Sequence, residues 1–157
     1  MDELSLFTLA LGLNKPWEVI DIKFSKDVGR LDLTIDFPRG STFTCPACGA
    51  GNCLVHDTKD RQWKHLNFFQ YETFIHSRVP RINCGQCGTK QIEVPWARPG
   101  SGFTLLFELL VLHFGREMSI AAVAELTQVR ANRIWRILGH YVERARKKVD
   151  LSGFHIL

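Results

Sequence analysis

The chain has 157 residues, of which 45% are hydrophobic and 23% are charged, as expected for a soluble globular protein with one ordinary domain or two small ones. The apolar stretch from Leu4 to Leu13 follows two acidic residues and is too short to cross a bilayer, which argues against a signal peptide and a membrane anchor. Without an export signal we expect a reducing compartment, and five cysteines, an odd number, do not suit a disulfide framework.

The net charge of +4 is distributed unevenly along the chain. Residues 116–148 carry eight basic and three acidic side chains, a local excess of five positive charges. Such a concentration of positive charge predicts a polyanionic partner.

The first elements in chain order are a helix and a hairpin. Leu4 to Leu13 predict a short buried helix. Two runs of alternating apolar and polar residues, "WEVIDIKF" and "LDLTIDF", then flank a turn that contains Gly29, which predicts a β-hairpin. The alternating apolar residues are Ile20, Ile22, Phe24, Leu31, Leu33, Ile35 and Phe37.

Residues 44–98 contain one further strand-like run, "YETFIHSRV", and several glycines and prolines. Pro80, Pro95 and Pro99 predict that this region is divided into short strands and turns. An apolar core built from this region alone would be thin, so a metal staple makes physical sense.

Four cysteines form two C-x-x-C-G motifs, with Cys45 and Cys48 in the first and Cys84 and Cys87 in the second. Two thiolates at this spacing can grip one metal ion from a tight turn, and two such turns give tetrahedral coordination by four cysteines. This donor set suits Zn²⁺ in a structural role and leaves no open position for catalysis.

Other chemistries stay open for the cysteines. An iron–sulfur cluster also takes four thiolates, whereas a redox pair would need a βαβ pattern that the sequence lacks. Cys53, His56 or His65 could replace a ligand, although we expect Cys53 to be an ordinary small residue and both histidines to make structural hydrogen bonds. The nearby Arg78, Arg81 and Lys90 can offset the negative charge of a zinc–thiolate centre, and the alternative for each is a solvated surface charge.

The sequence becomes helical from Phe103. "FTLLFELLVLHF" predicts a buried helix, and Ser119 predicts the N-cap of the next one. The run from Ile120 to Leu138 fits a helix-turn-helix, except that Gln128 replaces the usual glycine, so we expect a non-glycine turn conformation or a turn of different length. Five positions carry the match: Val123, Ala124, Val129, Ile134 and Ile137.

The second helix of this motif begins near Arg130 and supplies the candidate DNA contacts. We expect its N-terminal part to face base edges in the major groove and its later residues to contact phosphates. The base-edge candidates are Arg130, Asn132, Arg133 and Arg136; the phosphate candidates include Arg144 and Lys147. Trp135 and Tyr141 are predicted to be packing residues, and a helix with a solvated basic face is the alternative.

Several segments together resemble the N-terminal part of the ISL-three family of bacterial insertion-sequence transposases: "CPACG", "HDTKDRQWKHL", "VPRINCGQCG", "VPWARPG" and the helix-turn-helix. The resemblance implies that Cys45, Cys48, Cys84 and Cys87 are zinc ligands and that the partner is double-stranded DNA at the terminal inverted repeats of an insertion sequence. It also implies a role in transposition and DNA recombination in the bacterial cytoplasm, at the nucleoid, with a homodimer as one possible assembly and neither a membrane nor a small-molecule substrate as partner.

The sequence therefore predicts an α+β chain. We expect an N-terminal hairpin with a β-rich four-cysteine zinc-finger domain over residues 1–98 and an all-α helix-turn-helix domain over 99–149. Residues 150–157 would begin a missing catalytic domain of the acidic DDE type. The family's first catalytic aspartate would lie beyond Leu157, so no catalytic residue and no enzymatic activity are expected of this chain.

Three other functions differ from this prediction. One is a zinc-stapled protein-interaction module with the helix at 103–114 as a dimer interface, and another is a DNA binder like a transcription regulator. The third is an enzyme with a site among Cys53, His56, Asp57 and His65, which the absence of a nucleophile–base pair disfavours.

Overall fold

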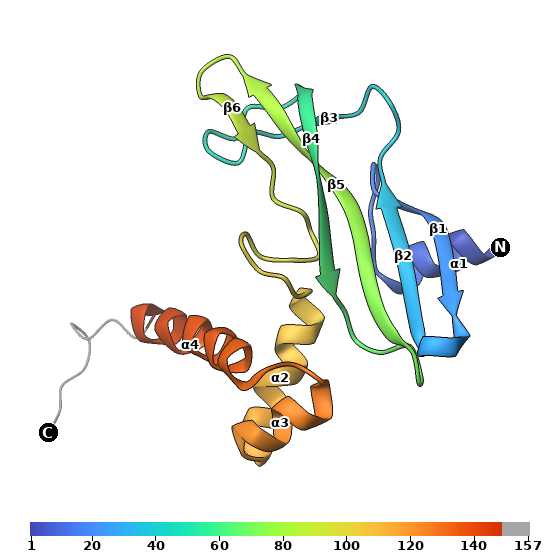
Figure 1. Ribbon diagram of the computed structural model, residues 1–157. Helices are drawn as coiled ribbons and strands as arrows, with labels where there is room; N and C mark the ends of the chain where they lie inside the picture. The colour runs from blue at the N-terminus through green and yellow to red at the C-terminus, as the bar shows by residue number, and fades with distance from the viewer. Residues whose placement is uncertain (149–157) are drawn as a thin grey trace, which may run out of the picture. The chain divides into compact units, whose positions relative to one another are not determined.

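The computed structural model describes residues 1–148 and divides the chain into two compact units, Met1–Leu106 and Phe107 onward (Figure 1). A β-sheet unit is followed by a helical unit, in agreement with an α+β chain. The expected start of a catalytic domain at 150–157 lies outside the described residues.

The strands are β1 (Glu18–Ser25), β2 (Arg30–Asp36), β3 (Thr42–Phe43), β4 (Cys53–Lys64), β5 (Glu72–Cys84) and β6 (Gly88–Gln91). The helices are α1 (Glu3–Ala10), the 3-10 turn η1 (Lys26–Val28), α2 (Leu105–Glu117), α3 (Ile120–Thr127) and α4 (Ala131–Lys148).

The first unit is organised around β5, the central strand of a six-stranded sheet. The strand order is β1-β2-β5-β4-β3, and β6 also pairs with β5. The β2–β5 pair is parallel and the other pairs are antiparallel. Because β4 runs along the length of β5, the strands β2 and β6 share its other side, β2 beside residues 72–77 and β6 beside 81–84.

Pro80 lies inside β5, so the prediction that the prolines divide this region into short strands is wrong at this position. Pro80 is opposite Thr58 of β4, and its carbonyl accepts a hydrogen bond from the Ile92 N–H (3.1 Å) on the β6 side. The nitrogen and carbonyl of one strand residue face the same side, so the missing proline N–H is directed away from β4. The proline therefore costs the β4–β5 ladder no hydrogen bond.

The predicted hairpin is confirmed as β1 and β2, but the residues on the inward face of β1 do not follow a simple alternation. The register between the two strands shifts between Val19 and Asp21. Trp17 and Val19 are buried, whereas Ile20 and Phe24 are 45% and 43% exposed. A bulge changes which residues point inward after it, so the predicted alternation is wrong at Ile20, whereas Ile22, after the bulge, packs partly against the core.

The predicted first helix is present, but it lies on the surface and none of its residues is buried. The Asp2 side chain caps it by accepting a hydrogen bond from the Ser5 N–H (2.8 Å). Leu4 and Phe7 pack partly against the sheet core, while Leu6 and Leu9 are exposed. The Thr8 hydroxyl accepts a hydrogen bond from the Val19 N–H (3.0 Å) and so ties the helix to β1.

One aromatic-rich core fills the first unit, and it draws on both the hairpin and the cysteine region. Trp96 packs edge-on against Trp17 (ring centroids 4.9 Å apart) and Trp63 (5.4 Å). Trp17 also packs edge-on against Phe37 at 5.4 Å. Such edge-to-face pairs are favourable beyond their buried area. The core is therefore shared, because the hairpin adds apolar residues to those of residues 44–98.

The second unit contains α2, α3 and α4. The prediction that the apolar run from Phe103 forms a buried helix is wrong in part. Only Phe107, Glu108 and Val111 of α2 are buried, and Leu109 is 53% exposed. Glu108 accepts a hydrogen bond from the Tyr141 hydroxyl (3.0 Å), which links α2 to α4. Despite the apolar sequence of α2, no helix in the described residues has the length and apolar character needed to cross a membrane.

Candidate metal centre and nucleic-acid interface

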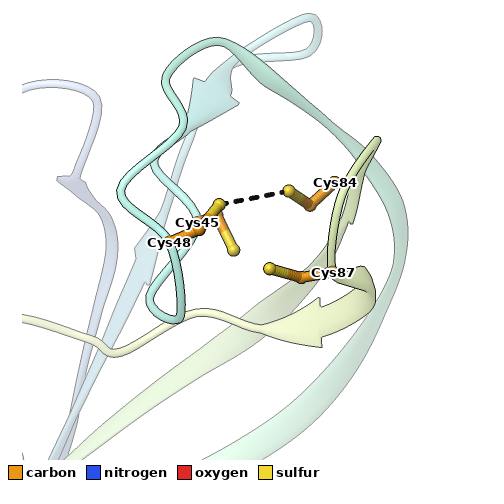
Figure 2. Close-up of side chains that lie close together, drawn as sticks. All are labelled: Cys45, Cys48, Cys84 and Cys87. Atoms are coloured by element: carbon orange, nitrogen blue, oxygen red, sulfur yellow. Dashed lines mark hydrogen bonds between the residues drawn. The ribbon is translucent and has the colours of Figure 1, made fainter.

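The four cysteines of the C-x-x-C-G motifs meet at one end of the sheet (Figure 2). Cys45 and Cys48 come from the loop after β3, and Cys84 and Cys87 from the turn between β5 and β6. All four sulfur atoms lie within 4.8 Å of one another, and the Cys48 and Cys84 sulfurs are 3.5 Å apart. Sulfurs at these separations are not disulfide-bonded, and all five cysteines are free thiols.

Glycine makes both cysteine turns tight enough for this arrangement. In the first turn, the Gly49 N–H donates to the Cys45 carbonyl (3.0 Å), and the Cys45 N–H donates to the Ala50 carbonyl (2.8 Å). In the second, Cys84 pairs with Gly88 where β5 turns into β6. Gly49 and Gly88 have φ of 77° and 78°, a left-handed conformation that glycine adopts without strain.

The turns also tune the four thiols. Backbone N–H groups of Gln86 and Cys87 lower the pKa of Cys84 to about 6. The Cys48 N–H likewise lowers the pKa of Cys45. The neighbouring Cys48 side chain, followed by burial, raises the pKa of Cys87 to about 12. Some thiols are thus held ready to ionise while others resist it, because adjacent thiolates repel one another unless a cation sits between them.

The donor set and its size fit Zn²⁺. Zinc–sulfur bonds of about 2.3 Å in a tetrahedron place the sulfurs about 3.8 Å apart, which is close to the separations here. Among residues 1–148 this is the only group of three or more Cys, His, Asp or Glu side chains close enough to hold a metal.

The other candidate ligands have partners elsewhere. The buried Cys53 thiol donates to the Ala50 carbonyl (3.4 Å). His65 Nδ1 is 2.7 Å from the Thr104 hydroxyl, and burial lowers the pKa of His65 to about 4, so its ring is neutral at physiological pH. His56 lies 3.4 Å from the Asn83 side chain. The prediction of structural hydrogen bonds for both histidines is confirmed, and these side chains form no common site with Asp57, which pairs with Arg81.

Two of the basic residues near the cysteines form ion pairs with aspartates. Arg78 pairs with Asp36 at 2.6 Å, and Arg81 pairs with Asp57. Both arginines are therefore neutralised by aspartates rather than by the thiolates. The positive charge that is left for a polyanion lies mainly in the helical unit.

The helix-turn-helix is formed by α3 and α4. The Ser119 hydroxyl accepts from the Ala122 N–H (3.2 Å), which confirms the predicted N-cap. The four predicted apolar core positions are all buried: Val123, Val129, Ile134 and Ile137.

Gln128 corrects the prediction for the turn. It adopts the left-handed conformation (φ 58°, ψ 35°) that glycine usually supplies at the end of the first helix. Its side-chain amide donates to the Glu125 carbonyl (2.7 Å), which satisfies one of the open carbonyls at the helix end. The turn therefore keeps the glycine-type geometry with a different residue.

We expect Gln128→Gly to raise the free energy of unfolding of the helical unit by about 0.5 kcal/mol, because glycine avoids the left-handed strain but loses the side-chain bond and gains unfolded-state freedom. Gln128→Ala keeps the strain and loses the bond, so it should be less stable than the unmodified protein. Thermal melts followed by circular dichroism give the order, and a glycine variant less stable than alanine would show that Gln128 is unstrained.

The candidate DNA contacts are all exposed: Arg130, Asn132, Arg133, Arg136, Arg144 and Lys147. With about 100° between successive helical residues, Asn132 lies nearly opposite the buried Ile134 and Ile137, and Arg136 lies nearly opposite Ile134. Lys147 lies about 21 Å further along the helix than Arg133. The structure thus separates an N-terminal group on α4 from a basic C-terminal end, as the prediction requires.

Two ranges of the chain match family models of transposases. Residues 41–92 match the zinc-finger of transposase IS204/IS1001/IS1096/IS1165, and residues 92–142 match the helix-turn-helix domain of transposase family ISL3. The chain belongs to the ISL3 transposase family. The zinc-finger range includes all four clustered cysteines, and the helix-turn-helix range includes Arg130 to Arg136.

Curated relatives of this ISL3 family member are transposases. The chain is 30% identical to the transposase for insertion sequence element IS1557 of Mycobacterium tuberculosis, over 96% of the chain and 35% of that protein. It is 30% identical to the transposase for IS1001 of Bordetella parapertussis, over 54% of the chain and 21% of that protein. The chain thus spans about a third of the length of the first of these relatives. No solved structure matches it.

Proposed function

We propose that residues 1–148 are a zinc-stabilised DNA-binding part of an ISL3 transposase that recognises the terminal inverted repeats of an insertion sequence. The observation that carries the proposal is the exposed face of α4, where Asn132, Arg133 and Arg136 lie on a helix-turn-helix whose first helix is capped and whose apolar positions are buried. The match of residues 92–142 to the helix-turn-helix domain of transposase family ISL3 supports the proposal. The expected domain limits at 1–98 and 99–149 stay predictions.

In this proposal Cys45, Cys48, Cys84 and Cys87 hold a structural Zn²⁺. When bound, the ion supplies a cross-link between the loop after β3 and the β5–β6 turn and neutralises the repulsion between thiolates. Four sulfur ligands leave it no open position, so the centre stabilises the sheet unit and takes no part in a reaction.

In this proposal the helical unit recognises the base sequence. The N-terminal residues of α4 enter the major groove, where arginine can bind guanine through two hydrogen bonds and asparagine can bind adenine in the same way. Arg144 and Lys147 contact phosphates, which fix the position of the helix without reading sequence.

We assign DNA binding, and not strand cleavage, to the described residues. Two-metal phosphoryl transfer needs carboxylates that converge on a metal pair. Within residues 1–148 the four-cysteine cluster is the only candidate metal group, and it contains no carboxylate.

Fluorescence anisotropy tests the proposal with a duplex from the ends of the parent insertion sequence and a scrambled duplex, each at two salt concentrations. Tighter binding to the ends that persists at the higher salt is the expected result. Equal, salt-sensitive binding to both duplexes would reduce the function to a basic surface. Self-association without DNA binding would instead support the protein-interaction module.

The phosphate role of Lys147 gives a separate prediction. Lys147→Ala should weaken binding to the ends and to scrambled DNA about equally, and it should reduce the salt dependence of log K by about one unit. Titrations of both duplexes over a salt series measure this slope. A loss confined to the ends would show that Lys147 reads sequence.

A further inference from the structure

Trp135 differs from the other tryptophans of the chain. Trp17, Trp63 and Trp96 are at most 9% exposed and form the core of the sheet unit. Trp135 lies on α4 and is 60% exposed, so the prediction that it is a packing residue is wrong. An indole that large gains little stability for the fold when most of it faces solvent.

The position of Trp135 on α4 places it on the outward face. It follows Asn132 by three residues, and Arg136 follows Asn132 by four, so Trp135 and Arg136 are both neighbours of Asn132 on the helix surface and flank it. One turn further along, the position that a Cβ of Gly139 would occupy has no atom within 4 Å apart from the local backbone of α4 and the two flanking residues. A ligand can therefore approach the indole closely from that side.

The charges around Trp135 identify the partner class. Arg133, Arg136 and Arg146 are exposed on the same helix, and acidic residues are few: only Glu143 lies on α4, 3.8 Å from Arg146. An apolar side chain within a positive surface complements a ligand that carries apolar groups inside a polyanionic frame. The major groove of DNA is such a ligand, because the thymine 5-methyl group lies between the two phosphate backbones.

We propose that Trp135 reads thymine through apolar contact with its 5-methyl group in the major groove, beside the contacts of Asn132 and Arg136. This inference rests on the proposed DNA-binding function and adds one specific base contact to it. The helix then combines polar reading by Asn132 and Arg136 with apolar reading by Trp135.

Acrylamide quenching of tryptophan fluorescence tests the contact directly. Trp135 is the one exposed tryptophan of the four in the chain, so it gives nearly all of the quenchable emission. Binding of the ends should reduce the quenching constant by about twofold or more, because the groove covers the indole. Acrylamide is neutral, so it does not compete with DNA for the arginines. Trp135→Phe should remove the quenchable emission and identifies its source.

Deoxyuridine substitution tests the base. Replacing one thymine at a time in the end duplex should reveal a position where loss of the methyl weakens binding about fourfold. The Trp135→Ala variant should bind the normal ends about tenfold more weakly. Its binding should not change when that thymine is replaced by deoxyuridine. Leu126→Ala is the matched control, because Leu126 is 57% exposed but lies on α3, and it should bind like the unmodified protein.

The outcomes separate this inference from the proposed function. If the ends bind specifically but Trp135→Ala binds as tightly as the unmodified protein, or if no thymine position responds, the Trp135 assignment is wrong and the proposed function stands. If neither duplex binds, the proposed function itself fails. If the indole becomes shielded without DNA as protein concentration rises, Trp135 belongs to a protein interface and the assignment is wrong.

Discussion

We expect the Cys84→Ser protein to retain no zinc and to lose about 4 kcal/mol or more of the free energy of unfolding of the sheet unit. A ligand that binds only the folded state contributes about that much when its free concentration is a thousand times its dissociation constant, and structural zinc sites commonly bind more tightly. Cys84 is the last residue of β5, the central strand. Its loss therefore removes a metal ligand at the point where the sheet leads into the β5–β6 turn. Metal analysis and chemical denaturation measure the two effects.

Cys53→Ala is the matched control for this substitution. Cys53 is also buried, at 7% exposed, but its thiol bonds to the Ala50 carbonyl and lies outside the four-cysteine cluster. This variant should keep one zinc per chain and lose only about 1 kcal/mol. A Cys84→Ser protein that still binds one zinc tightly, or a Cys53→Ala protein that binds none, would contradict the assigned ligand set.

The double variant Arg133→Ala/Arg136→Ala should lose most of its preference for the insertion-sequence ends. Each base-reading arginine contributes about 1–3 kcal/mol, so both together should weaken specific binding by about a thousandfold. Binding to scrambled DNA should fall far less, because the phosphate contacts further along α4 remain. Titrations with both duplexes at one salt concentration measure the ratio.

The double variant Arg39→Ala/Arg116→Ala is the control for the loss of positive charge alone. Both of these arginines are exposed, and neither lies on α4, so the control removes the same net charge away from the reading face. It should preserve the ratio of the two affinities. An equal loss on both duplexes from the α4 variant would instead show that Arg133 and Arg136 act only through their charge.

The features that the sequence predicted well are those with strict local rules. The C-x-x-C-G spacing requires two turns that present thiols to one point, and the four sulfurs do meet there. Apolar spacing across a capped helix pair likewise identified Val123, Ile134 and Ile137 as core. In both cases a few residues close in sequence determine the local geometry of each turn or helix.

The predictions that were wrong depended on contacts between distant segments. The register shift between Val19 and Asp21 leaves Ile20 on the outward face of β1, and Pro80 is tolerated in β5 because its nitrogen faces away from β4. The core is thicker than residues 44–98 alone suggest, because Trp17 of the hairpin packs against Trp96. Trp135 was predicted to be a packing residue, whereas it is 60% exposed on α4.

Selection from a fragment library tests the central claim most directly. The zinc-loaded protein is mixed with random fragments of the insertion sequence that encodes it and of its flanking DNA, and the bound fragments are sequenced. We predict strong enrichment of fragments from both ends, with the inverted repeat at the centre of each peak. Even recovery across the element, or a single internal peak, would contradict recognition of the terminal repeats.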